Sequence, residues 1–129
     1  MITEDYCSYE IAKLLKEKGF DAECRAAYTN YGKLFTTQIQ QYITNVLCSR
    51  GTLWDCTAPT HQMAMRWLRD VHKLSIEPFY MFPAIWEIDI KYIDKKTDLS
   101  EFEDIRDKSY NSYEEAAEAG IKYCLENLI

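Results

Sequence analysis

Four side chains in the middle of the sequence are of the types that bind zinc: Cys48, Cys56, His61 and His72. Structural zinc sites usually present two closely spaced ligand pairs, and these residues form no such pair. If one helix carries both histidines, they stand on the same side but about 16 Å apart along its axis. One ion cannot bind both, so we expect no metal ligand in this set and no cofactor.

The same segment holds the residue types of a thiol hydrolase. Cys56 would be the nucleophile and His61 the base, with Asp55 or Asp70 orienting the imidazole. None of the local signatures of known catalytic cysteines surrounds Cys56. A chain with five cysteines and two histidines supplies such a set by chance. We therefore assign no catalytic residue and favour a protein that is not an enzyme. A Cys/His-dependent enzyme stays open as an alternative.

A basic patch and a high tyrosine content supply the candidate binding residues. Arg66, Arg69 and Lys73 could meet an acidic partner or a phosphate. The ten tyrosines offer large contact areas with a polar hydroxyl, which suits interfaces, although they also suit the rim of a small domain. The residues assigned to binding are Arg66, Arg69, His61 and Tyr113.

Charge and glycine usage argue against two functional classes. The net charge of −6 and the isoelectric point near 4.9 oppose nucleic-acid binding, which needs a basic face. Acidic residues are concentrated between Asp94 and Glu118. They predict a solvated surface or, alternatively, a docking surface for a basic partner. The four glycines form no phosphate-binding loop, although a small-molecule or nucleotide binder of another kind stays open.

The cysteine pattern and the first residues favour a reducing compartment. The five cysteines are scattered without short paired spacings, and residues 1–5 show no signal-peptide character. No segment approaches the ~18 apolar residues of a membrane span. We expect a cytoplasmic protein with free thiols, no disulfide and no membrane association.

Two amphipathic helices are expected in the first 72 residues. One begins after the capping residue Ser8 and ends at Lys18, before a Gly19 stop. The other begins at about Ala58 and ends near His72. Its predicted apolar stripe consists of Ala64, Trp67, Leu68 and Val71.

The C-terminal helix has the strongest local signals. Ser112 and Glu115 have the spacing of a capping box. Its predicted apolar stripe is Tyr113, Ala116, Ala117, Gly120, Ile121, Cys124 and Leu128. A glycine costs a helix about 1 kcal/mol, so Gly120 in this stripe predicts close approach to a sheet.

Residues 74–82 and 85–93 predict two strands of an antiparallel hairpin around Pro83-Ala84, and Pro78 suggests an edge or a bulge. Residues 23–28 and 53–56 predict further strands. The whole chain, residues 1–129, is expected to be one α+β domain. In that domain a small antiparallel sheet of three to five strands is packed by two or three amphipathic helices, including the capped C-terminal one.

Two segments have weaker patterns. From Phe35 to Cys48 a helical stripe competes with strand-forming residue types, and we favour a helix. From Asp98 to Asp107 a short acidic helix is expected, because Ser100 and Glu103 also have capping-box spacing.

Three sequence segments resemble those of a family of small uncharacterised proteins from gut Bacteroidales and their phages and prophages. They are Cys7–Phe20, Ala58–Arg69, and Tyr113–Ala116 with Tyr123–Ile129, about a third of the chain. The resemblance implies a bacterial or phage cytoplasmic setting and an accessory role. It implies no site residue, because no function is established for that family. We expect a non-enzymatic module that binds another protein or itself.

Overall fold

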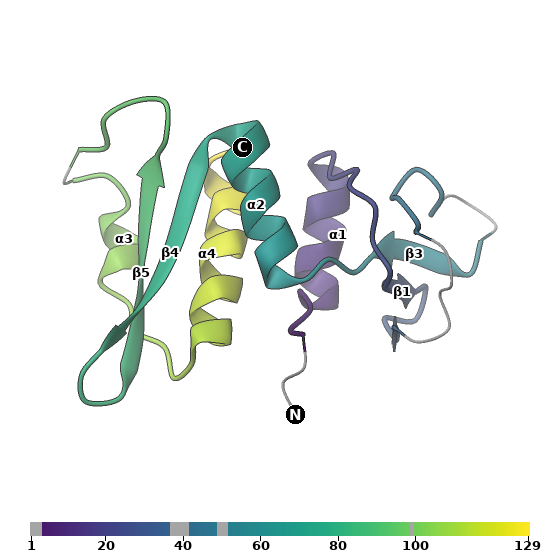
Figure 1. The fold of residues 1–129 in the computed structure, drawn as a ribbon, viewed down its shortest axis with the longest axis horizontal. Coiled ribbons are helices and arrows are strands. Elements are labelled where there is room, and N and C mark those ends of the chain that lie inside the picture. The colour runs from purple at the N-terminus through teal and green to yellow at the C-terminus, as the bar shows by residue number, and fades with distance from the viewer. Residues whose placement is uncertain (1–3, 37–41, 49–51, 99) are drawn as a thin grey trace. The chain divides into compact units, whose positions relative to one another are not determined.

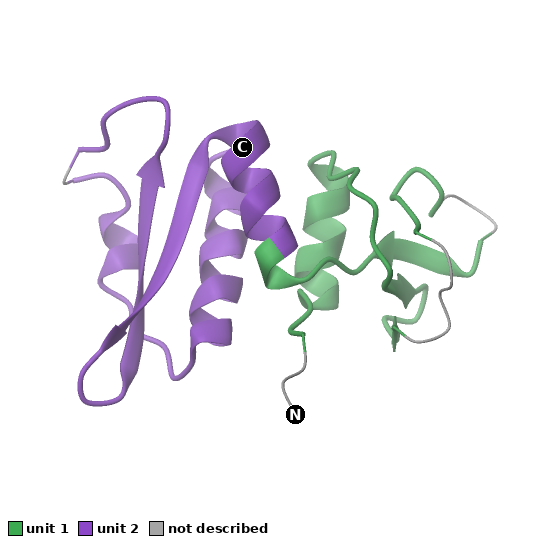
Figure 2. Ribbon diagram, viewed as in Figure 1, with its two compact units in different colours: residues 1–62 green, residues 63–129 purple. Residues whose placement is uncertain are grey.

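The computed structural model describes residues 4–36, 42–48, 52–98 and 100–129. The chain divides into two compact units, residues 1–62 and 63–129, and the boundary falls inside helix α2, His61–His72 (Figure 2). Each unit has its own sheet. The single domain expected from the sequence therefore stays a prediction.

Unit 1 combines one helix with a small antiparallel sheet (Figure 1). Helix α1 spans Tyr9–Glu17, and strands β1 (Ala27–Thr29), β2 (Leu34–Phe35) and β3 (Trp54–Thr57) follow. The strand order is β2-β1-β3. A cluster of buried side chains joins the helix to the sheet; it consists of Ala12, Ala26, Tyr28, Cys56 and Ala58.

The ends of α1 are those predicted from the sequence. The Ser8 hydroxyl accepts a hydrogen bond from the Ile11 amide at 3.3 Å, which satisfies one of the unpaired donors of the first turn. Lys18 is the C-cap, and Gly19 follows with φ +91°. A left-handed residue at this position favours glycine, so a local signal ends the helix correctly.

Unit 2 consists of a long hairpin and the helices around it. Strands β4 (Leu74–Met81) and β5 (Ile85–Tyr92) pair antiparallel along their whole length. Helices α3 (Glu103–Arg106) and α4 (Tyr113–Asn127) follow, and α4 packs on the hairpin (Figure 1). These elements confirm the α+β class, the antiparallel pairing and the C-terminal helix.

The start of α4 and its contact with the sheet were both predicted correctly. The Ser112 hydroxyl accepts from the Glu115 amide at 3.1 Å, as a capping box requires. The Glu115 carboxylate accepts from the Asn111 amide at 3.1 Å, one residue before the Ser112 amide that the capping box predicts. A Cβ atom added to Gly120 would lie 2.8 Å from Cγ2 of Ile76. Only a glycine lets the helix approach the strand this closely.

Two local predictions were wrong, and a third was right only in part. In the described part of Phe35–Cys48 there is a strand end at Phe35, an isolated bridge from Ile43 to Cys24, and a turn, but no helix; residues 37–41 lie outside the described residues. Val71 is 56% exposed, because the buried stripe of α2 ends at Leu68. The short acidic helix expected between Asp98 and Asp107 is present as α3, but it is only four residues long and begins after Phe102, with no side-chain cap, so the predicted Ser100–Glu103 cap is wrong.

The cysteine prediction is confirmed. All five cysteines are free thiols, and all are buried. Among the helices of the described residues, none combines the length and apolar character that a bilayer crossing requires.

Candidate protein-interaction surface

The cysteine proposed as a nucleophile does not have the surroundings of one. Cys56 is fully buried, and burial together with the charge of Asp55 raises the pKa of its thiol to about 12. The Asp55 carboxylate accepts a hydrogen bond from the Tyr9 hydroxyl. Since thiolates are the reactive form, Cys56 is inert at neutral pH. The geometry therefore argues against a thiol hydrolase centred on Cys56.

Burial explains the other thiols in the same way. It raises the pKa of Cys24 to about 11 and that of Cys124 to about 12, and it also raises the pKa of Cys48. These side chains therefore act as small apolar core residues.

The predicted basic patch lies on the exposed side of α2. Arg66 and Arg69 are both exposed. Arg66 Nε lies 3.4 Å from the Asp70 carboxylate, and Lys73 Nζ donates to the Asp70 carbonyl at 2.8 Å. Two of the three cations, Arg66 and Lys73, therefore already contact Asp70 of α2. His61, at the start of α2, is buried, and its backbone amide donates to the Asp5 carbonyl at 3.0 Å.

Tyr113 lies in a row of aromatic rings that joins α4 to the hairpin. Its ring meets Trp86 edge-on, with centroids 5.5 Å apart, and Trp86 meets Tyr80 at 5.4 Å. Edge-to-face pairs at these distances are favourable. The first turn of α4 is therefore fixed to the Tyr80–Trp86 pair, which lies close to the turn of the hairpin.

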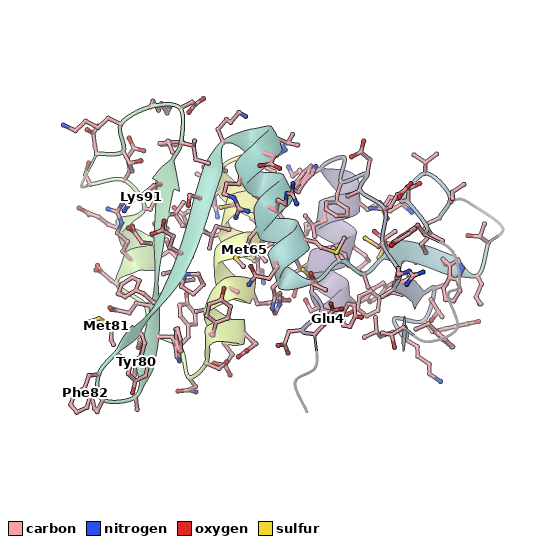
Figure 3. All side chains as sticks on the ribbon, in the orientation of Figure 1. Glu4, Met65, Tyr80, Met81, Phe82 and Lys91 are labelled. Carbon is pink, nitrogen blue, oxygen red and sulfur yellow. The ribbon has the colours of Figure 1, made fainter. Side chains whose placement is uncertain are left out.

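Around this pair, the hairpin exposes a set of large apolar side chains that we call the hairpin tip. It consists of Phe79 (40% exposed), Tyr80 (51%), Met81 (41%), Phe82 (90%) and Ile85 (39%). Figure 3 shows Tyr80, Met81 and Phe82 together at the end of the hairpin. The nine residues from Pro78 to Trp86 include no charged residue, in a chain of which 28% is charged. Contiguous exposed apolar patches of this kind mark interaction sites.

Two features leave the tip exposed. Phe79, Met81 and Ile85 lie on the face of the hairpin away from α4, and the turn at Phe82 lies beyond the first residue of that helix. Alternate residues of the hairpin point toward α4, and Ile88 and Ile90 on this face are buried. Helix α4 begins at Tyr113, whose ring already contacts Trp86. Residues 82–84 form the turn, and α4 does not extend over them (Figure 1).

The backbone pattern shows which edge of the hairpin is open. Trp86 exchanges both backbone hydrogen bonds with Tyr110, at 2.8 and 2.7 Å, so its amide and carbonyl point away from β4. Because hydrogen-bonded and non-hydrogen-bonded pairs alternate, Pro78 opposite Ile88 also directs its nitrogen outward. Pro78 therefore costs the hairpin no internal hydrogen bond. The register is regular, which confirms the predicted edge rather than a bulge.

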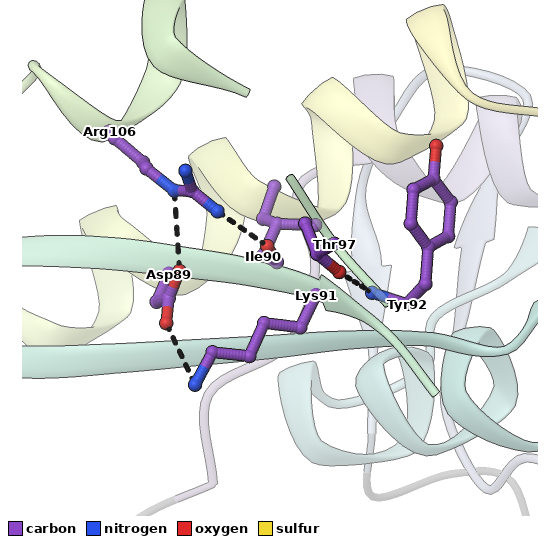
Figure 4. Close-up of polar contacts among 6 residues, drawn as sticks. All are labelled: Asp89, Ile90, Lys91, Tyr92, Thr97 and Arg106. Atoms are coloured by element: carbon purple, nitrogen blue, oxygen red, sulfur yellow. Dashed lines mark hydrogen bonds and ion pairs between the residues drawn. The ribbon is translucent and has the colours of Figure 1, made fainter. Parts of the chain in front are cut away.

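A group of charged residues lies farther along β5 (Figure 4). The Asp89 carboxylate lies 3.4 Å from Arg106 Nε and 3.2 Å from Lys91 Nζ. Arg106 also donates to the Ile90 carbonyl, and the Tyr92 amide donates to the Thr97 hydroxyl at 2.8 Å. These residues line an open hollow. The contacts attach α3 and the preceding loop to β5, so we assign them a structural role.

The sequence-based interpretation placed the tip residues in strands without recognising them as a surface. The missed signal is the run of uncharged residues around a Pro-Ala turn, because a turn between two surface strands is ordinarily polar. The chain matches no protein-family model, no curated protein and no solved structure.

Proposed function

We propose that this protein is a non-enzymatic binding module and that the hairpin tip is its contact surface for another protein. The observation that carries the proposal is Phe82, a phenylalanine 90% exposed among four other exposed apolar side chains. Exposing this much apolar surface is unfavourable in water. Binding a partner removes it from water.

The composition of the tip supports the proposal. Aromatic residues and methionine are enriched at the centres of protein interfaces, and charged residues are depleted there. The tip combines Phe79, Tyr80, Met81 and Phe82. Its rigid support favours binding as well, since the Tyr80 ring rests on Trp86 and its hydroxyl bonds the Pro83 carbonyl at 2.5 Å. A preorganised surface loses less entropy when it binds.

The cellular location and biological source of the protein are proposed on the resemblance alone. The three sequence segments that are similar to Bacteroidales and phage proteins support a cytoplasmic accessory protein of a bacterium or phage. The raised pKa of Cys56 argues against the Cys/His-dependent enzyme, the alternative considered for this sequence.

A pair of matched variants tests the proposal. Phe82→Ser removes the most exposed tip side chain, and Tyr31→Ser removes a 95% exposed aromatic in unit 1. The full-length tagged proteins are compared by quantitative pull-down from host cells. We expect wild type and Tyr31→Ser to retain the same partner and Phe82→Ser to lose it. Equal retention by all three proteins would contradict the proposal.

A further inference from the structure

The hairpin tip cannot make a stable interface by itself. Its five partly exposed side chains offer on the order of 500 Å² of surface. A standard stable interface takes about 800 Å² from each partner. The residues beside the tip must therefore enter the interface, and their charge then selects the partner.

The residues beside the tip on the face away from α4 are acidic. Glu87 stands directly opposite Phe79 in the register, and Glu77 lies two residues before Phe79 on the same face of β4. We call Glu77 and Glu87 the acidic rim. Between residues 74 and 90 the hairpin carries three acidic residues and no basic one.

The two cations nearest this face, Lys91 and Arg106, both pair with Asp89, at 3.2 and 3.4 Å. Lys91 also lies close enough to Glu77 for its charge to help raise the lysine pKa, whereas no such interaction with Glu87 contributes to it. Neither Glu77 nor Glu87 has an ion pair with any residue in the part of the chain that the structure describes. The first turn of α4, which contacts Trp86, adds the exposed Glu114 and Glu115.

From this arrangement we infer that the hairpin tip binds a basic protein, one with an apolar groove whose rim carries lysine or arginine side chains. The inference rests on the proposed function and names its partner class. The projecting tip fills the groove, and the acidic rim meets the cations around it. Complementary charges of this kind speed association and exclude wrong partners.

The same observations disfavour the other ways to cover the tip. In a two-fold dimer the same patch of each copy meets, so Glu77 and Glu87 would face acidic residues of the second copy. An anionic membrane would meet the same repulsion. Strand addition to the open edge of β4 is hindered, because Pro78 presents no amide there.

The experiment first identifies the partner and then measures its charge dependence. The full chain with p-benzoylphenylalanine in place of Phe82 is photo-crosslinked in host cells, and the captured protein is purified. Its affinity for wild type, for Glu77→Gln/Glu87→Gln and for Phe82→Ser is measured from low to high salt. The control Asp94→Asn/Glu126→Gln changes the net charge equally at exposed sites away from the tip.

We expect the captured protein to be basic at its binding site. The rim variant should bind about three- to ten-fold more weakly at low salt, the loss expected for two exposed ion pairs, and its affinity should vary less with salt. The control should bind like wild type. One result would overturn the inference and leave the proposed function standing. In that result the partner binds wild type but not Phe82→Ser, and its affinity changes neither with salt nor with the rim variant.

Other outcomes overturn the inference or both proposals. If position 82 crosslinks to a second copy of the chain and the protein sediments as a dimer, the tip serves self-association and the inference of a basic partner is wrong. Binding only to vesicles, either of phosphatidylcholine or of equal parts phosphatidylcholine and phosphatidylserine, would contradict both proposals. So would a captured protein that binds Phe82→Ser as well as wild type.

Discussion

Because Gly120 lies against Ile76, we expect replacement of this helix glycine by alanine to destabilise the protein, the opposite of its usual effect on stability. On an exposed helix, replacing glycine by alanine stabilises by about 1 kcal/mol. At position 120 the added Cβ lies 2.8 Å from Cγ2 of Ile76 and 3.4 Å from two carbons of Ile88. The Ile76 methyl sits on a stiff, β-branched side chain and cannot rotate away freely.

Overpacking of a core costs about 1–3 kcal/mol, which exceeds the gain in helix propensity. We therefore expect Gly120→Ala to lower the free energy of unfolding by about 1 kcal/mol, measured by urea denaturation. In an Ile76→Ala background the obstructing methyl is gone, and Gly120→Ala should stabilise by about 1 kcal/mol. Ala119→Gly, on the same helix, calibrates the propensity effect. Stabilisation by Gly120→Ala in the wild-type background would refute the close packing of α4 on β4.

Three further predictions concern groups away from the tip. Cys56 should resist iodoacetamide at pH 8 in the folded protein and react after unfolding, because its pKa is raised to about 12; rapid native labelling would contradict its burial. Tyr9→Phe removes the hydrogen bond to Asp55 and should destabilise by about 1 kcal/mol in urea, whereas the exposed Tyr31→Phe should not; equal effects would show that the bond contributes nothing. Burial lowers the pKa of His72, so the unfolded chain binds more protons near pH 6, and stability falls as the pH drops below the ordinary histidine pKa. His72→Gln should lessen this fall in pH-dependent urea curves, and an unchanged fall would contradict the prediction.

The helix ends could be predicted because their causes are local. The Ser8 hydroxyl, the left-handed Gly19 and the Ser112–Glu115 capping box each act within a few residues. Gly120 was informative for a related reason, since a costly glycine inside an apolar stripe needs a packing explanation.

The errors come from contacts that are distant in sequence. In the segment 35–48 helical and strand preferences were balanced, and pairing decided the outcome: Phe35 joins Ala27, and Ile43 joins Cys24. Val71 fits the helical stripe but lies beyond the part of α2 that is covered. Periodicity predicts a face of a helix, but it does not predict where the neighbouring element ends.

The hairpin tip was missed for the same reason. Phe79 and Met81 have the composition of a buried strand. They alternate along β4 with Ile76 and Tyr80, which lie on the side of α4, so Phe79 and Met81 lie on the opposite face, which α4 does not cover. Only the three-dimensional arrangement shows which face of the hairpin α4 covers.

The central claim is that Phe82 serves binding rather than folding. Its most direct test is the dissociation constant of the crosslinked partner for Phe82→Ser and for wild type, with urea curves confirming equal stability. We predict a loss of at least about 30-fold, as for the central residues of other interfaces. Affinities that agree within about two-fold, at equal stability, would contradict the claim.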